Sequence, residues 1–314
     1  MSFQWTVATS QRLDAFLADQ NPALSRARVQ KMIAAGGVEV NGEEATKSSM
    51  KLKEGDSVFQ SVEGEDVVEE SIIQPKDLQL SVLYEDEECM VIEKPAGFAV
   101  HPAAGIPKED ATVLHGIAHL FEERGIPFAS EAVLVHRLDK ETTGCLLIAK
   151  NPETHQLLQK QFEHRDVSKH YLAIVAGQPD PPKAIIDSPI GRNLTDRTKM
   201  SVLRTSVSRE AKTTYRTLQN AAGATLVQCE LHTGRTHQIR VHLSSVGHPI
   251  LGDVAYGSSS STSLTKQHAI EGICLHAWKL TFLSPTKLQE IAVEAPLPVT
   301  FLSALKMFGL EVPS

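Results

Sequence analysis

Cysteine is scarce in this chain, and the cysteines that occur are not paired in sequence. The 314 residues include four of them, far apart and without any C-x-x-C spacing. Paired cysteines of that kind mark structural zinc sites and redox motifs, so the sequence indicates neither. Disulfide frameworks belong to oxidising compartments. We therefore expect reduced, mostly buried thiols and a cytoplasmic location; the four residues are Cys89, Cys145, Cys229 and Cys274.

Long apolar runs and phosphate-binding glycine motifs are missing too. No run approaches the roughly 18–20 apolar residues that a membrane helix needs. The first ten residues, MSFQWTVATS, lack the basic start and apolar centre of a secretory signal. Neither G-x-G-x-x-G nor G-x-x-x-x-G-K-[ST] occurs. The sequence therefore predicts no membrane partner, no secretion signal and no nucleotide cofactor.

An overall excess of positive charge, which nucleic-acid-binding proteins often have, is also lacking. The formal net charge is −7. The acidity is local, however, because residues 61–90 hold 10 acidic and one basic side chain. Residues 183–240 hold 10 basic and 4 acidic side chains. Affinity for a phosphate backbone follows the local patch, so the composition does not exclude an RNA-binding groove.

The first 60 residues predict a small domain. Residues 11–20 have the apolar spacing of a short helix. A second helix is expected over residues 26–35, with Ser25 as its N-cap and a Gly-Gly stop after it. Residues 38–40 then alternate as a strand, and Asn41-Gly42 favours a tight hairpin turn.

Residues 61–77 form an acidic linker without clear periodicity, and residues 78–314 form a second, larger domain. The order of elements there predicts an α+β fold with a mixed, mainly antiparallel sheet and flanking helices. Residues 82–97 are expected to form two strands joined by an acidic turn and followed by a Pro/Gly turn. Further expected strands cover 98–102, 133–135, 145–149, 171–175, 226–231 and a pair from 275 to about 296. The expected helices cover 111–123, 152–164, a segment capped by Thr236, and 299–308, and the serine-rich residues 257–265 are expected to be a loop.

The segment His136-Arg137-Leu138-Asp139-Lys140 lies between two apolar runs, so it is expected to be a loop at strand ends. Its carboxylate has a cation on either side, and an opposite charge favours the ionised form that a nucleophile or base needs. Loops on a rigid sheet are where chemistry concentrates. From these residues alone, an ordinary surface ion pair remains the alternative.

Two further segments carry clustered polar groups. Gly234-Arg235 stands directly before an expected helix, where a guanidinium beside free backbone N–H groups would bind an anion. Arg192, Arg197 and Lys199 concentrate charge in one turn and are expected to contact phosphate, with a solvated hairpin tip as the alternative. A zinc site is not expected, because the histidines of this region are spaced so that they diverge on a helix; they are His232, His237, His242 and His248.

These motifs resemble those of the RluA/RluD-type pseudouridine synthases over nearly the whole chain. The matching segments are the H-R-L-D of residues 136–139, the K-P-A-G of residues 94–97, the V-H-P of residues 100–102, Tyr171 at 32 positions after Asp139, and T-G-R-T-H-Q-I-R-V-H-L from Thr233, followed by G-H-P-I-L-G-D from Gly247. The resemblance implies that uridine in RNA is isomerised to pseudouridine.

The resemblance also assigns roles. Asp139 is the nucleophile, Tyr171 packs on the uracil, and Arg235 pairs with the carboxylate. The target base leaves its stack, and Arg137 fills the vacated space or contacts the backbone. His136, Arg192, Arg197 and Lys199 complete the expected substrate contacts. No metal or cofactor is implied, since no redox change and no leaving group is involved. The sequence leaves open whether the aspartate attacks ribose or base, or removes a ribose proton.

The N-terminal segment resembles the α-L RNA-binding domain of a small-subunit ribosomal protein, the S4-like domain. The matching text is Arg12-Leu13-Asp14, Ser25-Arg26-Ala27-Arg28 and residues 37–42. It implies that a basic helix contacts the RNA backbone, which positions the protein without specifying a sequence. The residues expected to do so are Arg26, Arg28, Lys31 and Lys47, with ordinary solvated charges as the alternative.

The substrate expected from the resemblance is large-subunit ribosomal RNA. Alternatives are a pseudouridine synthase for transfer RNA, and a ribosome-assembly factor that binds RNA without catalysis. A hydrolase is disfavoured, because neither a G-x-S-x-G elbow nor a second carboxylate of a glycosidase pair is indicated. The protein is expected to be monomeric.

Overall fold

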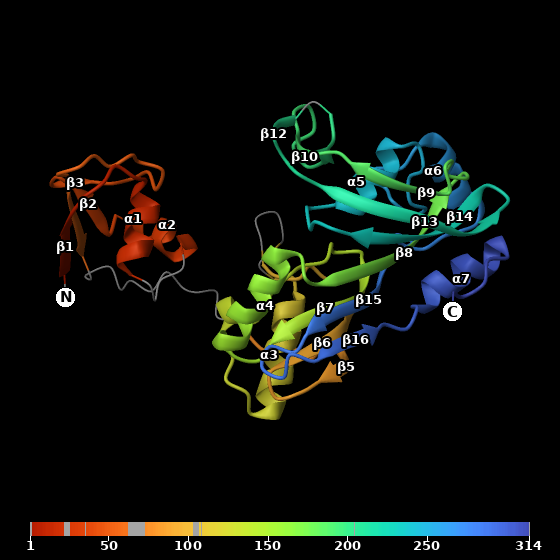
Figure 1. The fold of residues 1–314 in the computed structure, drawn as a ribbon, viewed down its shortest axis with the longest axis horizontal. Coiled ribbons are helices and arrows are strands. Elements are labelled where there is room, and N and C mark those ends of the chain that lie inside the picture. Colours follow the sequence, from red (N-terminus) through yellow and green to blue (C-terminus); the bar gives the residue numbers. More distant parts are fainter. Residues whose placement is uncertain are drawn as a thin grey trace. The chain divides into compact units, whose positions relative to one another are not determined.

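The computed structural model describes the chain except for residues 1, 22–25, 35, 62–72, 103–106, 108, 204 and 314. The side chains of residues 2, 26–28, 31, 61 and 206 are also outside the description. The expected cap Ser25, most of the acidic linker, and the side chains of Arg26, Arg28 and Lys31 therefore lie outside the described residues. The chain divides into two compact units, Met1–Ile72 and Ile73–Ser314 (Figure 1).

The first unit packs two helices on a small antiparallel sheet. Its elements are β1 (Ser2–Thr6), α1 (Leu13–Gln20), α2 (Arg26–Ala34), β2 (Val38–Val40), β3 (Glu43–Glu44) and β4 (Ser57–Ser61). The strand order is β1-β4-β2-β3. Asn41 and Gly42 both have positive φ, as a tight β2–β3 hairpin requires. The expected helices, strand and turn are confirmed, and Leu13, Leu17 and Ile33 form the buried core between them.

The second unit contains the remaining elements. They are, in chain order, β5 (Ser81–Glu85), β6 (Cys89–Lys94), α3 (Val113–Arg124), the 3-10 helix η1 (Ser130–Ala132), β7 (Thr143–Ala149), α4 (Pro152–His164), β8 (Ser168–Ala176), β9 (Lys183–Asp187), β10 (Ile190–Asn193), β11 (Met200–Ser201), β12 (Thr205–Arg209), β13 (Lys212–Ala221), β14 (Ala224–Leu231), α5 (Gln238–Ser245), α6 (Ser259–Gln267), β15 (Leu275–Leu283), β16 (Glu290–Glu294) and α7 (Val299–Phe308). Of the helices in the described ranges, none combines the length and the apolar character of a membrane span.

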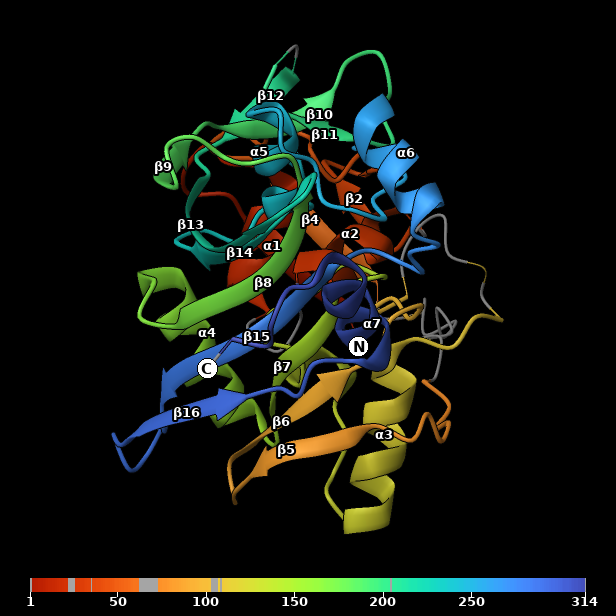
Figure 2. The ribbon, with the colours of Figure 1, turned by 90° about the vertical axis from the view of Figure 1, so that its right-hand side faces the viewer.

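The described strands of this unit form one large mixed sheet and one small sheet. The large sheet has the order β5-β6-β7-β15-β8-β14-β13-β9, with β16 added beside β15. Figure 2 shows β5, β6, β7, β15 and β8 side by side. All neighbours pair antiparallel except β7 and β15, which are parallel. The expected α+β class with a mainly antiparallel sheet is confirmed, and a small sheet β11-β10-β12 lies apart from it.

Side-chain alternation along β6 and β7 assigns the two faces of the large sheet. Met90 and Ile92 of β6 pack in the same core as Phe121 of α3. Val91, one position along the same strand, packs instead with Leu158 of α4. Successive side chains of a strand point to opposite faces, so helices α3 and α4 cover opposite sides of the sheet. The core on the α3 side continues to Ile239 and Leu243 of α5 and so reaches the other half of the sheet.

Two of the expected strands are wrong, because their backbone groups are used elsewhere. The carbonyls of Ala99 and Val100 accept from the first N–H groups of α3 and therefore pair with no strand. The expected strand over 133–135 is reduced to a single bridge between Leu134 and Ile148. Nearby, the ring of His136 accepts a hydrogen bond from the backbone N–H of Leu147. A neighbouring strand would otherwise accept from that N–H.

The ends of two expected elements also differ. Helix α5 is not capped by Thr236: it begins at Gln238, and the preceding His237 has a left-handed backbone with φ of 56°. The serine-rich segment expected to be a loop forms α6. There the hydroxyl of Ser258 accepts from the backbone N–H of Ser261, so a capping box starts a helix that composition alone does not predict.

Gly144 sets the distance between β7 and its parallel neighbour β15. Its φ is +109°, and a Cβ at this position would lie 2.2 Å from the carbonyl oxygen of Ala277. Only glycine combines this backbone conformation with so close an approach. The contact fixes where β7 begins, and therefore where the loop before it is held.

We expect Gly144→Ala to lower the free energy of unfolding by about 3 kcal/mol, since a left-handed alanine costs roughly 1–2 kcal/mol and overpacking adds a similar amount. Urea denaturation measures the loss. The matched control is Gly125→Ala at the end of α3, which also has positive φ but has no atom within 4 Å of the added Cβ. Equal losses in the two variants would contradict a role for the Ala277 contact.

Candidate active site

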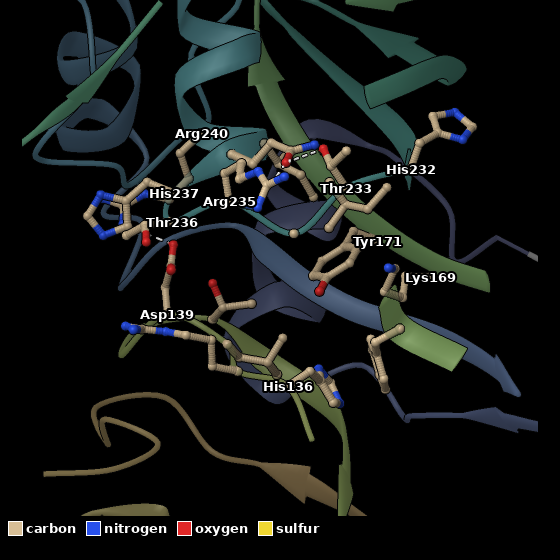
Figure 3. Close-up of a pocket in the computed structure, with 18 of the residues that line it drawn as sticks. His136, Asp139, Lys169, Tyr171, His232, Thr233, Arg235, Thr236, His237 and Arg240 are labelled. Carbon is tan, nitrogen blue, oxygen red and sulfur yellow. Dashed lines mark hydrogen bonds and ion pairs between the residues drawn. The ribbon is translucent and has the colours of Figure 1, made fainter. Parts of the chain in front are cut away.

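A pocket of about 490 Å³ opens in the second unit between three segments of the chain (Figure 3). It is lined by the loop before β7, the end of α4 with the start of β8, and the turn between β14 and α5. Five of the residues expected at a site line it: His136, Arg137, Asp139, Tyr171 and Arg235. Volumes of roughly 300–1,000 Å³ are typical of small-molecule sites.

The sheet brings these distant residues together through its register. Gly144 lies opposite Ala277, Ala277 lies opposite Tyr171, and Tyr171 lies opposite Cys229. One line across β7, β15, β8 and β14 therefore connects the strand after Asp139 to the strand before the α5 turn. Neighbouring strands are about 4.8 Å apart, so the line across these four strands is only about 14 Å long.

A buried lysine holds the loop that carries Asp139. Lys94 is fully buried at the end of β6, and its Nζ donates to the carbonyl oxygens of Pro95, Lys140 and Thr142 at 2.7–2.9 Å. Burial lowers the pKa of Lys94 to about 8. All three N–H bonds of the ammonium have acceptors, so the cost of burying the charge is offset and the loop is fixed to the sheet.

The carboxylate of Asp139 is paired with Arg240 from the first turn of α5. Nη1 of Arg240 lies 3.3 Å from Oδ2 of Asp139. The same guanidinium donates through Nε and Nη2 to the two oxygens of Asp253, at 2.8 and 2.9 Å. Burial by itself would lower the pKa of Arg240, but the hydrogen bonds and charge of Asp253, and then the charge of Asp139, raise it. The buried carboxylate of Asp253 therefore orients the guanidinium, and the guanidinium in turn faces the carboxylate of Asp139.

This geometry corrects the expected partner of Asp139, which was Arg235. Arg235 lines the pocket, but its Nε donates to the carbonyl oxygen of Glu210 at 3.0 Å. The reason is local: Arg235 lies in the turn, whereas Arg240 lies on the helix that faces the sheet. Gln238 fixes that turn, because its Oε1 accepts from the N–H of Arg235.

Tyr171 lies in the wall of the pocket on β8. It is only 7% exposed, and within the described residues its hydroxyl has no hydrogen-bond partner. Burial and then the charge of Asp139 raise the pKa of the Tyr171 hydroxyl. The phenol is therefore neutral and free to contact a ligand.

His136 is more tightly held than a substrate-contacting side chain needs to be. Its Nε2 accepts from the backbone N–H of Leu147 at 2.9 Å, and its ring stacks on Phe162. Burial and then the charge of Lys169 lower the pKa of His136 to about 3. A neutral imidazole therefore supports the loop, and its role in binding substrate stays a prediction.

The other basic residues are less central. Arg137 is exposed at the pocket, as a group that contacts RNA has to be. Arg192, Arg197 and Lys199 belong to the exposed turn of the small sheet and do not line the pocket; Nη1 of Arg192 donates to the carbonyl of Arg197. Lys47 is exposed in the first unit.

The histidines near α5 each form their own hydrogen bonds and do not converge on one point. His237 shares a 2.7 Å hydrogen bond with the hydroxyl of Tyr256, which accepts from the N–H of Met200 in the small sheet. His242 bonds Thr213 and the carbonyl of Ser188. Across the described ranges, no cluster of three or more His, Cys, Asp or Glu is placed to hold a metal ion.

Sequence reasoning missed Arg240 and Lys169 as pocket groups, and Asp253 as the residue that holds Arg240. Arg240 and Asp253 stand inside quoted motifs, but a motif with two arginines gives no local reason to choose the second. Lys169 lies two positions before Tyr171, ahead of the expected strand 171–175 but within β8 of the structure. Period-2 alternation could have assigned it to the same face as the tyrosine.

Comparison with known proteins gives the same assignment for both units. The family described as RNA pseudouridylate synthase matches residues 88–245, and the S4 domain matches residues 11–58. An uncharacterized RNA pseudouridine synthase of Aquifex aeolicus is 39% identical over 93% of this chain and 92% of that protein. Ribosomal large subunit pseudouridine synthase D of Vibrio parahaemolyticus is 37% identical over 92% of this chain and 88% of that protein.

Solved structures agree with the fold. Human RNA pseudouridylate synthase domain containing 4 superposes with a TM-score of 0.60 and 30% identity, over 74% of this chain and 95% of that one. Human RNA pseudouridylate synthase domain containing 1 gives a TM-score of 0.56 at 23% identity, which supports the fold.

We expect His136 to make stability fall on acidification. The folded-state pKa of about 3 lies below the ordinary 6.5, so below pH 6.5 the unfolded chain binds a proton that the native state does not. Stability is then lost as the pH falls from 6.5 toward 3, by up to about 1.4 kcal/mol per pH unit. Chemical denaturation at several pH values measures this slope.

His136→Gln is the matched variant, because an amide oxygen still accepts from the Leu147 N–H but does not titrate. It should be less stable at pH 7, through the lost stack on Phe162, and should show a shallower slope between pH 6.5 and 3. An unchanged slope in the variant would show that His136 is not the titrating group.

Proposed function

The chain belongs to the RNA pseudouridylate synthase family, and from this premise we propose that it isomerises uridines of large-subunit ribosomal RNA with Asp139 as nucleophile. Pseudouridine synthase activity on RNA follows from the family. The choice of ribosomal RNA is supported by relatives that are named ribosomal large subunit pseudouridine synthase D. Transfer RNA is the second candidate.

The observation that carries the proposal is the setting of Asp139. It is the carboxylate of the pocket that pairs with a largely enclosed cation, Arg240, and whose charge acts on a buried tyrosine, Tyr171. In Figure 3 these side chains converge on one space from three different segments. Preorganised charge of this kind stabilises a reacting group without reorganisation during the reaction.

The reaction needs little more than this. The N1–C1′ bond of uridine breaks, the C5–C1′ bond forms, C5 loses a proton and N1 gains one, so atoms and electrons balance without a co-reactant. Asp139 can act on the ribose, on the base, or by removing a ribose proton. We assign packing on the uracil to Tyr171, which lines the same pocket, and its neutral hydroxyl can exchange a proton.

The depth of the carboxylate supports base flipping. The side chain of Asp139 is only 17% exposed, so a base stacked within RNA cannot reach it. Enzymes that act on a base inside folded nucleic acid extrude it, at a cost of a few kcal/mol. Arg137, exposed beside the pocket, is positioned to occupy the vacated space. The S4 unit adds a second RNA contact, to which we assign the exposed Lys47 and the basic side chains of α2.

Purified protein incubated with large-subunit ribosomal RNA should form pseudouridine at discrete positions, and Asp139→Asn should reduce this to background. The amide keeps the shape of the carboxylate but is not a nucleophile. Pseudouridine is mapped chemically, and RNA binding is measured in parallel, with transfer RNA as the competing substrate.

The matched control is Asp166→Asn, an exposed aspartate after α4, which should leave turnover unchanged. Turnover by Asp139→Asn would remove the nucleophile assignment. Modification confined to transfer RNA would overturn the ribosomal substrate and leave the enzyme class intact.

Arg240→Lys should lower kcat by about 10²-fold, because the ammonium cannot span Asp253 and Asp139 at once. Arg235→Lys, the same change at the other arginine of the motif, should act mainly on KM. Circular dichroism checks that both variants fold. A larger loss of kcat in Arg235→Lys than in Arg240→Lys would restore Arg235 as the partner of Asp139.

A further inference from the structure

Lys169 is a buried cation in the pocket without an anion beside it. It lies on β8, lines the pocket and is 8% exposed. In the described part of the chain its Nζ takes part in no hydrogen bond or ion pair. Buried charges are ordinarily paired, so this ammonium is set up for a partner that the chain itself does not supply.

The surroundings of Lys169 add positive charge. Its Nζ lies 5.4 Å from the ring centre of Phe162, a cation–π contact. Burial and then the positive charge of Arg165 lower the pKa of Lys169. Arg165 also lines the pocket, and it is held in place by two hydrogen bonds to Glu210, at 3.2 and 3.1 Å. Two cations from one short stretch therefore face the same space.

The end of the pocket at Lys169 is separate from the end at Asp139. Lys169 and Tyr171 are two positions apart on one strand, which places them on the same face about 6.6 Å apart. Figure 3 shows Tyr171 between Asp139 and Lys169. The pocket lining as a whole carries more cations than anions: Arg137, Arg165, Lys169, Arg235 and Arg240 against Asp139 and Glu163.

We propose that Lys169, with Arg165, forms a subsite for the phosphodiester next to the target uridine. The inference rests on the proposed function in one respect, that the ligand of the pocket is RNA. With the nucleoside at Asp139 and Tyr171, the backbone leaves the pocket past Lys169. An ammonium is a compact point charge suited to a phosphate oxygen.

A phosphate fits these observations better than a carbonyl of the uracil. A neutral carbonyl accepts a hydrogen bond but brings no charge to offset the buried, unpaired ammonium of Lys169. A phosphate brings a full negative charge, and charge-assisted hydrogen bonds are about twice as strong as neutral ones. The uracil is therefore left to Tyr171, and Lys169 to the backbone.

The first test is Lys169→Met, which keeps the length and apolar packing of the side chain and removes its charge. Equilibrium binding to in vitro transcribed large-subunit ribosomal RNA should weaken roughly tenfold or more. The slope of log K against log salt should fall by about 0.7, the value for one phosphate of a single strand. Lys306→Met, the same change at an exposed position of α7, should alter neither quantity.

The second test locates the phosphate. A short RNA with the mapped target uridine is made with one methylphosphonate, which is neutral, either 5′ or 3′ of that uridine. The wild-type protein and Lys169→Arg should lose affinity for one of these RNAs. Lys169→Met should show a clearly smaller difference between that RNA and the unmodified RNA, because only Arg165 then remains to contact the phosphate.

The subsite would be overturned if each methylphosphonate lowered the RNA affinity of the wild type and of Lys169→Met by the same factor at both positions. This holds even if the substitution weakens binding, since the contact would then be to the base. A failure of the proposed function would be seen in a different measurement, because the wild type would then form no pseudouridine. The salt dependence of RNA binding by the wild type and by Lys169→Met could still be compared. An unchanged slope in Lys169→Met would reject the inference without touching the enzyme assignment.

Discussion

The site depends on the ion pairs of the largely enclosed Arg240 guanidinium with Asp253 and Asp139. The guanidinium is bound on one side by both oxygens of Asp253 and meets Asp139 with its remaining nitrogen. A buried charge of this kind costs free energy unless its geometry is well satisfied. The pair with Asp253 provides that geometry, so the cation can face Asp139 without needing Asp139 to hold it. The carboxylate of Asp139, the proposed nucleophile, is thereby paired through one oxygen only.

The rest of the unit serves to hold the two ends of this contact at a fixed distance. Lys94 ties the loop of Asp139 to three carbonyls, and Gly144 lets β7 approach β15 closely. On the other side, Gln238 fixes the turn before α5. These are rigid supports from strands and a helix, which place functional groups more accurately than free loops do.

Charge is distributed unevenly along the chain, and this agrees with a nucleic-acid ligand. The acidic side chains of residues 61–90 account for the net negative charge, whereas the pocket lining holds more basic than acidic groups. Within that lining, the paired cation Arg240 stands at the carboxylate and the unpaired cation Lys169 stands at the other end. In the proposed function the first orients the nucleophile, and in the proposed subsite the second binds a phosphate of the ligand.

Local periodicity and composition predict the two units, the α+β class, and most helices and strands. The choice of Asp139 and Tyr171 as site residues follows from the family resemblance of their motifs. The sequence did not determine the 98–102 segment, whose carbonyls turn to the start of α3, or the start of α6. It also chose Arg235 over Arg240. That pairing required the folded chain, since a salt bridge between residues 101 positions apart depends on the register of four strands and on which face of α5 is turned toward them.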